Sequence, residues 1–368
     1  MDLNQRITAF SNLGEFLKDY LSDAPKSDLA LQDFKTLTEE FTAVIETSHR
    51  QNAWFTPEYI KMALQSWSQM LTKETLTHWF AAYAASNTTS KRVAVIMAGN
   101  LPLVGFHDFL SVLLSGHHLI AKLSSDDKLL MPFLAKVLIK LEPSFESKIE
   151  FTQEKLPQFD AVIATGSNNT ARYFEYYFKD KPSIIRKNRN AVAILTGNET
   201  AEQLEALGSD IFNYFGMGCR SVSKLYVPQG YDFDAFFNAM YAHQDVINHH
   251  KYANNYDYNK AVYLMSLFPV LDNNFMVLKE DKNFSSPISV VFYEYYKSID
   301  ALKETLSTQE DQIQCIVAKN FDANEVAFGQ AQKPKLLFSK NAKTKTNAFS
   351  LSLSNCLGVI FSFSTTGV

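Results

Sequence analysis

The sequence has few of the features that mark secreted, membrane-spanning or metal-binding proteins. Only three of its 368 residues are cysteines, and their spacing fits neither a disulfide framework nor a zinc site. It contains no stretch of about 18 uninterrupted apolar residues. The opening residues MDLNQRITAF lack the basic region and apolar core of a secretory signal. We therefore expect a reduced, cytoplasmic protein without stable membrane insertion.

Long basic runs are also missing. The formal net charge is −4, so nucleic acid is not expected as a partner. Hydrophobic residues make up 46% of the chain and charged residues 20%, which is the balance of a folded protein. A chain of 368 residues exceeds the usual size of one core, so we expect two packed lobes.

The spacing of apolar residues changes near residue 90. Before it, segments such as 13–20 and 59–71 have the three- and four-residue spacing of helices. After it, short β-branched runs alternate with helical segments. Strands are predicted at 92–98, 118–123 and 159–164, with helices at 106–114, 127–141 and up to residue 178. This alternation predicts a doubly wound α/β fold with a parallel sheet.

A second α/β pattern begins at residue 191. Strands are predicted at 191–195, 223–227, 289–292 and 314–318, and a helix from Glu202 to about Tyr214. The chain has no Asp or Glu after Val326, so its composition near the end differs from the rest. We treat 334–368 as an atypical tail and expect no catalytic residue there.

Cys219 is the candidate nucleophile. It lies in FGMGCRS, between a predicted helix and a predicted strand, where Gly216 and Gly218 allow a sharp bend. Backbone N–H groups and Arg220 can lower the pKa of a thiol placed there. The alternative is a buried cysteine that acts as a small apolar residue, which is our reading of Cys315 in IQCIVA.

Polar residues follow the three strands predicted in the first sheet. Asn100 can donate to a developing oxyanion, and Lys122 can bind ribose hydroxyls or phosphate. Thr165-Gly166-Ser167 open a helix whose N-terminus attracts phosphate. A turn asparagine, a surface lysine and an ordinary strand-to-helix turn are the alternatives. The G-x-G-x-x-G fingerprint is absent from this region.

The order of these motifs resembles the aldehyde dehydrogenase superfamily, and within it the acyl-CoA reductase branch of LuxC-like fatty-acid reductases. The motifs are AGNLP (98–102), AKLSS (121–125), ATGS (164–167), AVAIL (191–195), FGMGCRSVSKLYV (215–227) and SSPISVVFYEYYKSIDAL (285–302). The resemblance implies a Rossmann-type cofactor domain at 91–188 and a second α/β catalytic domain at 189–333. Residues 1–90 would form a helical region that packs on the cofactor domain.

The resemblance also implies roles for individual residues. Cys219 matches the family's nucleophile and Asn100 its oxyanion-binding asparagine. Lys122 matches the lysine that holds the adenosine ribose. The turn at Thr165, Gly166 and Ser167 matches the pyrophosphate contact. No residue is assigned to a metal.

Two positions depart from the pattern of hydrolytic, NAD-selective members. Ile185 occupies the place of the glutamate that activates water, and SIIRKNRNA around it contains no acid. Ser125 occupies the place of a glutamate that would repel a 2′-phosphate. The first departure favours acyl exchange with a thiol over hydrolysis. The second favours NADPH, with NADH as the alternative cofactor.

The expected function is therefore NADPH-dependent reduction of a fatty acyl-CoA thioester to the aldehyde through a cysteinyl acyl-enzyme. An acyl-carrier protein is the alternative thioester donor. A non-redox cysteine acyltransferase or acyl carrier, and a non-catalytic subunit of a reductase complex, are the competing readings. A homo-oligomer or such a complex is the protein partnership to consider. Aromatic residues such as Phe109, Phe174 and Tyr177 permit a long acyl chain without requiring one.

Overall fold

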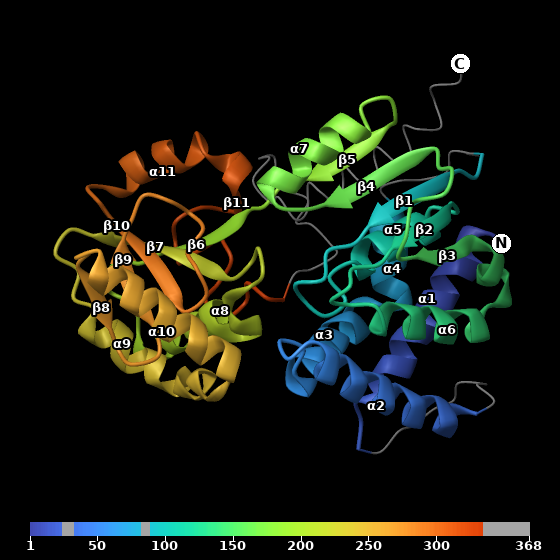
Figure 1. Ribbon diagram of the computed structural model, residues 1–368, viewed down its shortest axis with the longest axis horizontal. Helices are drawn as coiled ribbons and strands as arrows, with labels where there is room; N and C mark the ends of the chain where they lie inside the picture. Colours follow the sequence, from blue (N-terminus) through green and yellow to red (C-terminus); the bar gives the residue numbers. More distant parts are fainter. Residues whose placement is uncertain (24–32, 82–88, 334–368) are drawn as a thin grey trace. The chain divides into compact units, whose positions relative to one another are not determined.

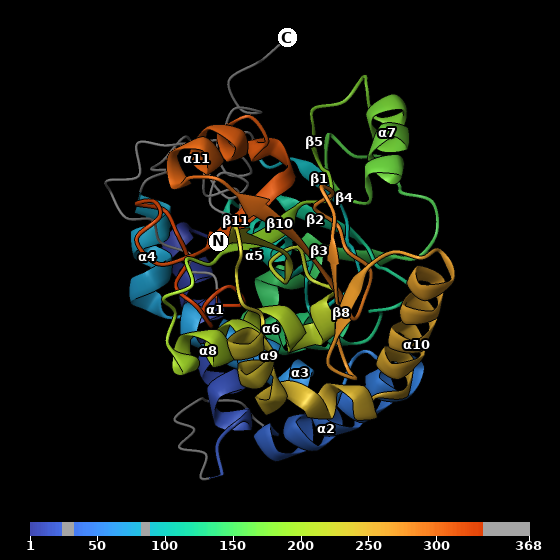
Figure 2. The same ribbon diagram turned by 90° about the vertical axis from the view of Figure 1, so that its left-hand side faces the viewer.

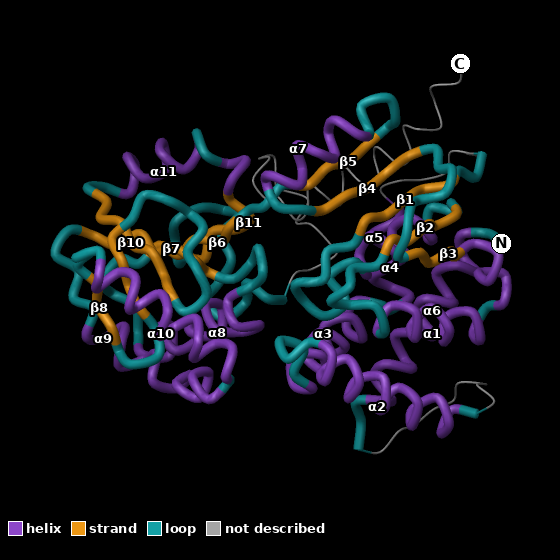
Figure 3. Tube along the Cα trace, viewed as in Figure 1, coloured by secondary structure: helices purple, strands orange, loops and turns teal. Residues whose placement is uncertain are grey.

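The structure, a computed structural model, describes residues 1–23, 33–81 and 89–333. These residues form two compact units, 1–188 and 189–333, and each contains one sheet flanked by helices (Figures 1 and 3). The predicted α/β fold with two sheets and a helical N-terminal region is confirmed. The tail at 334–368 lies outside the described residues.

The sheet of unit 1 consists of five parallel strands in the order β3-β2-β1-β4-β5. They are β1 (Arg92–Ile96), β2 (His118–Lys122), β3 (Ile149–Thr152), β4 (Ala161–Thr165) and β5 (Ser183–Arg186). The chain starts in the middle strand, winds outward to β3 and returns to the other side of β1. The strand order thus reverses between β1 and β4, and doubly wound sheets bind their ligands at the carboxyl ends of the strands at such a point.

Three helices connect these strands: α5 (Phe106–Leu114), α6 (Leu130–Leu141) and α7 (Asn168–Tyr177). A short 3₁₀ helix, Pro143–Lys148, leads into β3. Helix α5 packs on β1 and β2, while Phe174 of α7 packs against Ala94 and Val162 of the sheet. The helix predicted from Asp127 begins three residues later, at Leu130, because residues 124–127 form a tight bridged turn instead.

Four N-terminal helices complete unit 1: α1 (Leu3–Tyr20), α2 (Phe34–Gln51), α3 (Pro57–Met70) and α4 (Lys73–Ala81). Helix α1 contacts α3, α4, α5 and α6, and its Phe10 is buried against Phe109 and Phe145. Phe109 is therefore a core residue. Every helix of the described chain is too short or too polar to cross a bilayer.

The sheet of unit 2 has the order β11-β6-β7-β10-β9-β8, with only β8 antiparallel to its neighbour. The strands are β6 (Asn190–Ile194), β7 (Val222–Pro228), β8 (Val270–Asp272), β9 (Val277–Glu280), β10 (Val290–Tyr296) and β11 (Ile313–Val317). The helices are α8 (Ala201–Phe212), α9 (Asp234–Met240), α10 (His250–Met265) and α11 (Ile299–Ser307), with 3₁₀ turns at 213–216, 241–248 and 310–312. Helix α11 lies on one face of the sheet and α8 and α9 on the other (Figure 2).

Candidate active site

The polar residues predicted in unit 1 gather at one edge of its sheet. Ile96 of β1 is in register with Lys122 of β2 on one side and with Ala164 of β4 on the other. The loops that leave these three parallel strands therefore start side by side. The structure thus brings Asn100, Lys122 and Thr165 to the same edge of the sheet, with Ser125 and Ser167 on loops that start there.

The loop that carries Asn100 is held by the loop after β2. Asp127, which is buried, accepts the N–H of Leu103 at 2.9 Å, and Leu103 itself has a φ of 58°. A Cβ atom on Gly99 would lie 2.3 Å from Oγ of Ser124, so only glycine fits there. Burial raises the pKa of Asp127 to about 6 against the opposing hydrogen bond from Leu103. Asn100 is exposed at the tip of this fixed loop.

Lys122 and Ser125 both present polar groups at the edge. The ammonium of the half-buried Lys122 donates to the carbonyl of Glu154 at 2.7 Å. Ser125 is exposed three residues further on, and no carboxylate takes its place. An ammonium and a hydroxyl are groups that can bind ribose hydroxyls or a 2′-phosphate.

The turn after β4 leads into α7, and Ser167 caps the N-terminus of this helix. The hydroxyl oxygen of Ser167 accepts the N–H of Thr170 at 3.2 Å and caps α7, and Ser167 is exposed. A Cβ on Gly166 would lie 3.0 Å from the side chain of Thr170, and the Gly166 N–H donates to the carbonyl of Arg186. Phosphate contacts would therefore come from Ser167 and the first turn of α7. Together with Lys122, these groups fit a dinucleotide.

An ion pair that the sequence analysis missed joins α5 to β5 in the same unit. The guanidinium of Arg186 donates to both carboxylate oxygens of Asp108, at 2.7 and 2.8 Å. Burial would raise the pKa of Asp108, but Arg186 and His107 outweigh it and hold that pKa well below its usual range. An aspartate inside the apolar stretch FHDFLSVLL was the available signal, since a buried acid needs a partner.

Cys219 lies in unit 2, on an exposed turn between α8 and β7. The N–H of Ser221 donates to the carbonyl of Gly218 at 2.9 Å, and the N–H of Gly218 donates to Oγ of Ser221 at 3.1 Å. These two hydrogen bonds close the turn and leave Cys219 at its corner.

The bend before this turn is left-handed. Tyr214, Phe215 and Gly216 have φ values of 54°, 56° and 73° in succession. The helix predicted to about Tyr214 consequently ends at Phe212, before the first of these residues. Gly218 was expected to supply part of the bend but has no left-handed φ. The ring of Phe215 packs against His249 and Tyr252, whose contacts hold the bend in place.

Other candidate positions are placed away from solvent or away from the strand ends. Cys315 is buried in β11, and burial raises the pKa of its thiol. Ile185 lies in β5, in register with Ala164, and residues 183–190 contain no acid. Tyr177 is exposed and Phe174 packs on the sheet, so neither residue is assigned to the binding of an acyl chain.

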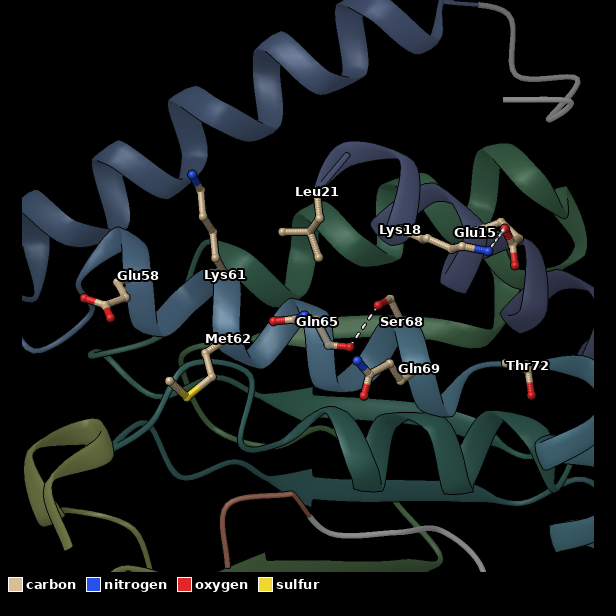
Figure 4. A pocket seen from close by; sticks show the side chains of 10 residues that line it. All are labelled: Glu15, Lys18, Leu21, Glu58, Lys61, Met62, Gln65, Ser68, Gln69 and Thr72. Carbon is tan, nitrogen blue, oxygen red and sulfur yellow. Dashed lines mark hydrogen bonds and ion pairs between the residues drawn. The ribbon is translucent and has the colours of Figure 1, made fainter. Parts of the chain in front are cut away.

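Two hollows lie within the described parts of the units. A cavity beside the Cys219 turn, lined in part by Phe215, Gly216 and Val222, has a volume of about 20 Å³, room for about one water. A hollow of about 1000 Å³ lies on the N-terminal helices, lined by Glu15, Lys18, Leu21, Glu58, Lys61, Met62, Gln65, Ser68, Gln69 and Thr72 (Figure 4). None of its residues belongs to the strand ends, so we do not assign it to the chemistry.

Comparison with known proteins places the chain in a family context. The family model described as acyl-CoA reductase (LuxC) matches residues 10–249, well over half of the chain. Among curated proteins, none matches this sequence.

Solved structures of aldehyde dehydrogenases share the fold. Aldehyde dehydrogenase 21 from Physcomitrella patens, solved with succinate, has a TM-score of 0.62 at 12% identity over 89% of this chain and 79% of its own. Indole-3-acetaldehyde dehydrogenase from P. syringae, solved with NAD+, has a TM-score of 0.61 at 11% identity over 88% and 78%. Lactaldehyde dehydrogenase from Escherichia coli has 0.59 at 11% over 88% and 80%. At such identities the likeness establishes the fold alone.

Proposed function

The chain belongs to the LuxC family of acyl-CoA reductases, and from this premise we propose that it reduces a fatty acyl-CoA with NADPH to the aldehyde through an acyl group held on Cys219. The general activity, aldehyde-forming reduction of an acyl group, follows from the family. The cofactor, the CoA donor and the cysteinyl intermediate are the parts that we add.

In the first step Cys219 acts as the nucleophile. Its thiolate attacks the thioester carbonyl, and the carbonyl oxygen becomes an oxyanion. The Asn100 amide and the Cys219 backbone N–H would stabilise that charge, because preorganised donors contribute most where charge develops. The bond to the CoA sulfur then breaks, CoA leaves as the thiolate, and the acyl group remains on the Cys219 sulfur.

In the second step the acyl group is reduced and released. NADPH, when bound, supplies the hydride to the acyl carbon. The same donors hold the oxyanion of the resulting thiohemiacetal. Its collapse breaks the carbon–sulfur bond, frees the aldehyde and returns the Cys219 thiolate.

Hydrolysis of the acyl-enzyme has to be slower than the second step if these two steps are to yield the aldehyde. The segment 183–190 has no carboxylate to act as a general base toward water, and Ile185 in β5 is apolar. Without a base, attack by water loses the acceleration of about 100-fold or more that proton abstraction supplies. The acyl group then persists long enough to be reduced or returned to a thiol.

Residues of unit 1 would hold the cofactor. Lys122 would bind the adenosine ribose, Ser167 and the N-terminus of α7 the pyrophosphate, and Ser125 would leave space for a 2′-phosphate. Lys122 and Ser125 lie at the end of β2 and Ser167 follows β4, the two strands that pair with β1, and this placement supports the assignment.

The exposure of Cys219 on its closed turn is the observation that carries the proposal, because Cys315, the other cysteine of the described chain, is buried. The test is acyl-CoA-dependent oxidation of NADPH by a Cys219→Ala variant, with Cys315→Ala as the matched control. We expect Cys219→Ala to be inactive and Cys315→Ala to keep its turnover. Full activity of Cys219→Ala would overturn the assignment. A panel of acyl-CoA lengths in the same assay identifies the preferred chain.

A further inference from the structure

A buried carboxylate lies close to the Cys219 turn without taking part in the proposed chemistry. Asp210, in the last turn of α8, has no solvent exposure. Its two oxygens accept the N–H groups of Gly329 at 2.6 Å and Ala331 at 2.8 Å. These donors lie more than a hundred residues further along the chain, in a segment 329–332 that we name the strap.

The strap binds in turn to the two residues that follow Cys219. The side chain of Arg220 donates through Nε to the carbonyl of Ala331. The amide of Gln332 donates to Oγ of Ser221 at 3.0 Å, and that same oxygen accepts the N–H of Gly218. An unbroken series of hydrogen bonds therefore leads from Asp210, through the strap, to both ends of the 218–221 turn.

The strap has little freedom of its own. Before it, Val326 is hydrogen-bonded to Ile316 and Ala318 next to β11. Within it, Gly329 has a φ of 76°, and a Cβ there would lie 3.1 Å from Ala206 of α8. Ala331 is fully buried. The strap is thus fixed between β11 and α8. A shift at Asp210 would therefore move the strap and, with it, the turn to which the strap is bound.

We propose that Asp210 is a positioning residue for the nucleophile, which acts by anchoring the strap and through it the turn that carries Cys219. The inference rests on the proposed role of Cys219. Without the contacts to the strap, an exposed four-residue turn could adopt other conformations, and nucleophilic attack needs a particular one. A misplacement of about 1 Å can cost about 100-fold in rate.

The energetics of Asp210 favour such a role. Burial raises its pKa to about 6, although the N–H groups of Gly329 and Ala331 and the charge of Arg220 act in the opposite direction. A fully buried carboxylate that binds backbone N–H groups is costly to place. Here its charge lies near that of Arg220, so its loss would free the strap and also remove a negative charge near the cation that follows Cys219.

The test compares Asp210→Asn with the native protein in the full chain. Asparagine keeps the size but turns its NH₂ group toward one of the two N–H donors, so it cannot hold both. We expect kcat to fall on the order of 10- to 100-fold, with little change in KM for the acyl-CoA. Cys219 should still be alkylated by iodoacetamide, detected by mass spectrometry, because the thiol stays exposed. A folded Asp210→Asn protein with native kcat would overturn the proposal.

Two further variants distinguish an effect on the position of the Cys219 turn from a general loss of protein stability. Gln332→Ala breaks the contact with Ser221 and leaves the buried carboxylate intact, so its kcat should also fall, and it decides the question if Asp210→Asn does not fold. Asp272→Asn is the control for stability. Asp272 lies elsewhere in unit 2 and accepts the N–H of Asn274 at 2.8 Å and the hydroxyl of Tyr256 at 2.7 Å, besides its ion pair with Lys260. An equal loss of kcat in Asp272→Asn would show a general effect of stability and overturn the positioning role.

The nucleophile assignment is tested separately by Cys219→Ala. If Cys219→Ala is active, the proposed function fails, whatever Asp210→Asn does. If Cys219→Ala is inactive while Asp210→Asn is fully active, only the role of Asp210 fails.

Discussion

At the scale of single residues, two aspartates hold the loops that carry the proposed catalytic groups. Asp127 accepts the N–H of Leu103 beside the Asn100 loop, and Asp210 anchors the strap beside the Cys219 turn. Both are buried, and burial raises the pKa of each to about 6. We therefore expect the free energy of unfolding to depend on pH through these two carboxyl groups.

Asp127 makes the chain less stable as the pH rises from about 4 to about 6. Its pKa is near 3.9 in an unfolded chain and about 6 in the folded one, so the folded state binds more protons in this interval. Asp127→Asn removes the titration. The free energy of unfolding of this variant, relative to native protein, should rise by up to about 3 kcal/mol between about pH 4 and about pH 7.

Chemical denaturation across that pH range measures the difference directly. Asp126→Asn, which changes the exposed neighbouring carboxyl, is the matched control. A difference between Asp127→Asn and native protein that stays constant with pH would contradict the predicted coupling.

Ser125 is expected to decide between the two nicotinamide cofactors. Ser125→Glu would place a carboxylate where we propose the 2′-phosphate binds, and like charges at close range cost several kcal/mol. We expect the Kd for NADPH to rise about ten-fold or more while the Kd for NADH changes little. Titration calorimetry with Ser125→Gln, similar in size and uncharged, separates charge from bulk. If Ser125→Glu and Ser125→Gln raise the Kd for NADPH equally, charge repulsion is not the cause.

At the scale of elements, the Asp108–Arg186 pair connects α5 to β5. Both side chains are largely withdrawn from solvent, with 7% and 22% exposed, so neither charge is well solvated alone. Arg186→Gln should lower the free energy of unfolding by about 3–5 kcal/mol, because it leaves a buried carboxylate without its counter-charge. The contribution of Asp108, whose pKa is held low, is present above about pH 4 and is lost as the pH falls further.

Urea denaturation measures this loss, and the exposed pair Arg92–Glu150 supplies the control. Glu150→Gln should change stability by no more than about 1 kcal/mol, since its side chain is 48% exposed. The double variant Asp108→Asn/Arg186→Gln should recover part of the loss. If Arg186→Gln costs no more than Glu150→Gln, the buried pair does not stabilise unit 1.

The elements predicted from the sequence are those with a strong local signal. Strands β1, β2, β4 and β6 are buried, β-branched runs, and each was predicted within a few residues. Strands β3, β5, β8 and β9 have three or four residues and were missed. In β5 the sequence SIIR ends in Arg186, whose place in the fold depends on Asp108 and has no local signature.

The candidate site was predictable only in its motifs. Asn100, Lys122, Gly166 and Cys219 lie in short, recognisable segments, and their roles stay predictions. The hydrogen bonds that hold these segments in place could not be predicted, because they join residues that are distant in the sequence, such as Asp210 and the strap. The bend at Tyr214 and Phe215 could not be predicted either, because aromatic residues disfavour a left-handed backbone unless tertiary packing imposes it.

At the scale of the whole molecule, the proposed functions divide between the two units. Lys122 and Ser167 belong to unit 1 and Cys219 to unit 2. We expect Lys122→Ala to lose the thermal shift that NADPH gives the native protein, yet to acquire an acyl group on Cys219 from acyl-CoA. Cys219→Ala should show the reverse. Thermal denaturation and intact-protein mass spectrometry measure the two properties independently.

The outcome also separates the competing functions. A native protein that is acylated by acyl-CoA but shows no thermal shift with NADPH or NADH would be an acyl carrier or acyltransferase. Loss of both properties in a folded Lys122→Ala protein would contradict the division of labour between the units.

The left-handed bend before Cys219 has a consequence for the order in which the protein is made. A left-handed residue other than glycine costs about 1–2 kcal/mol, so Tyr214 and Phe215 adopt this backbone only when something else holds them. Phe215 is held by the rings of His249 and Tyr252. During translation Cys219 leaves the ribosome some thirty residues before these partners. The nascent chain therefore carries the thiol before it can form the bend that precedes it.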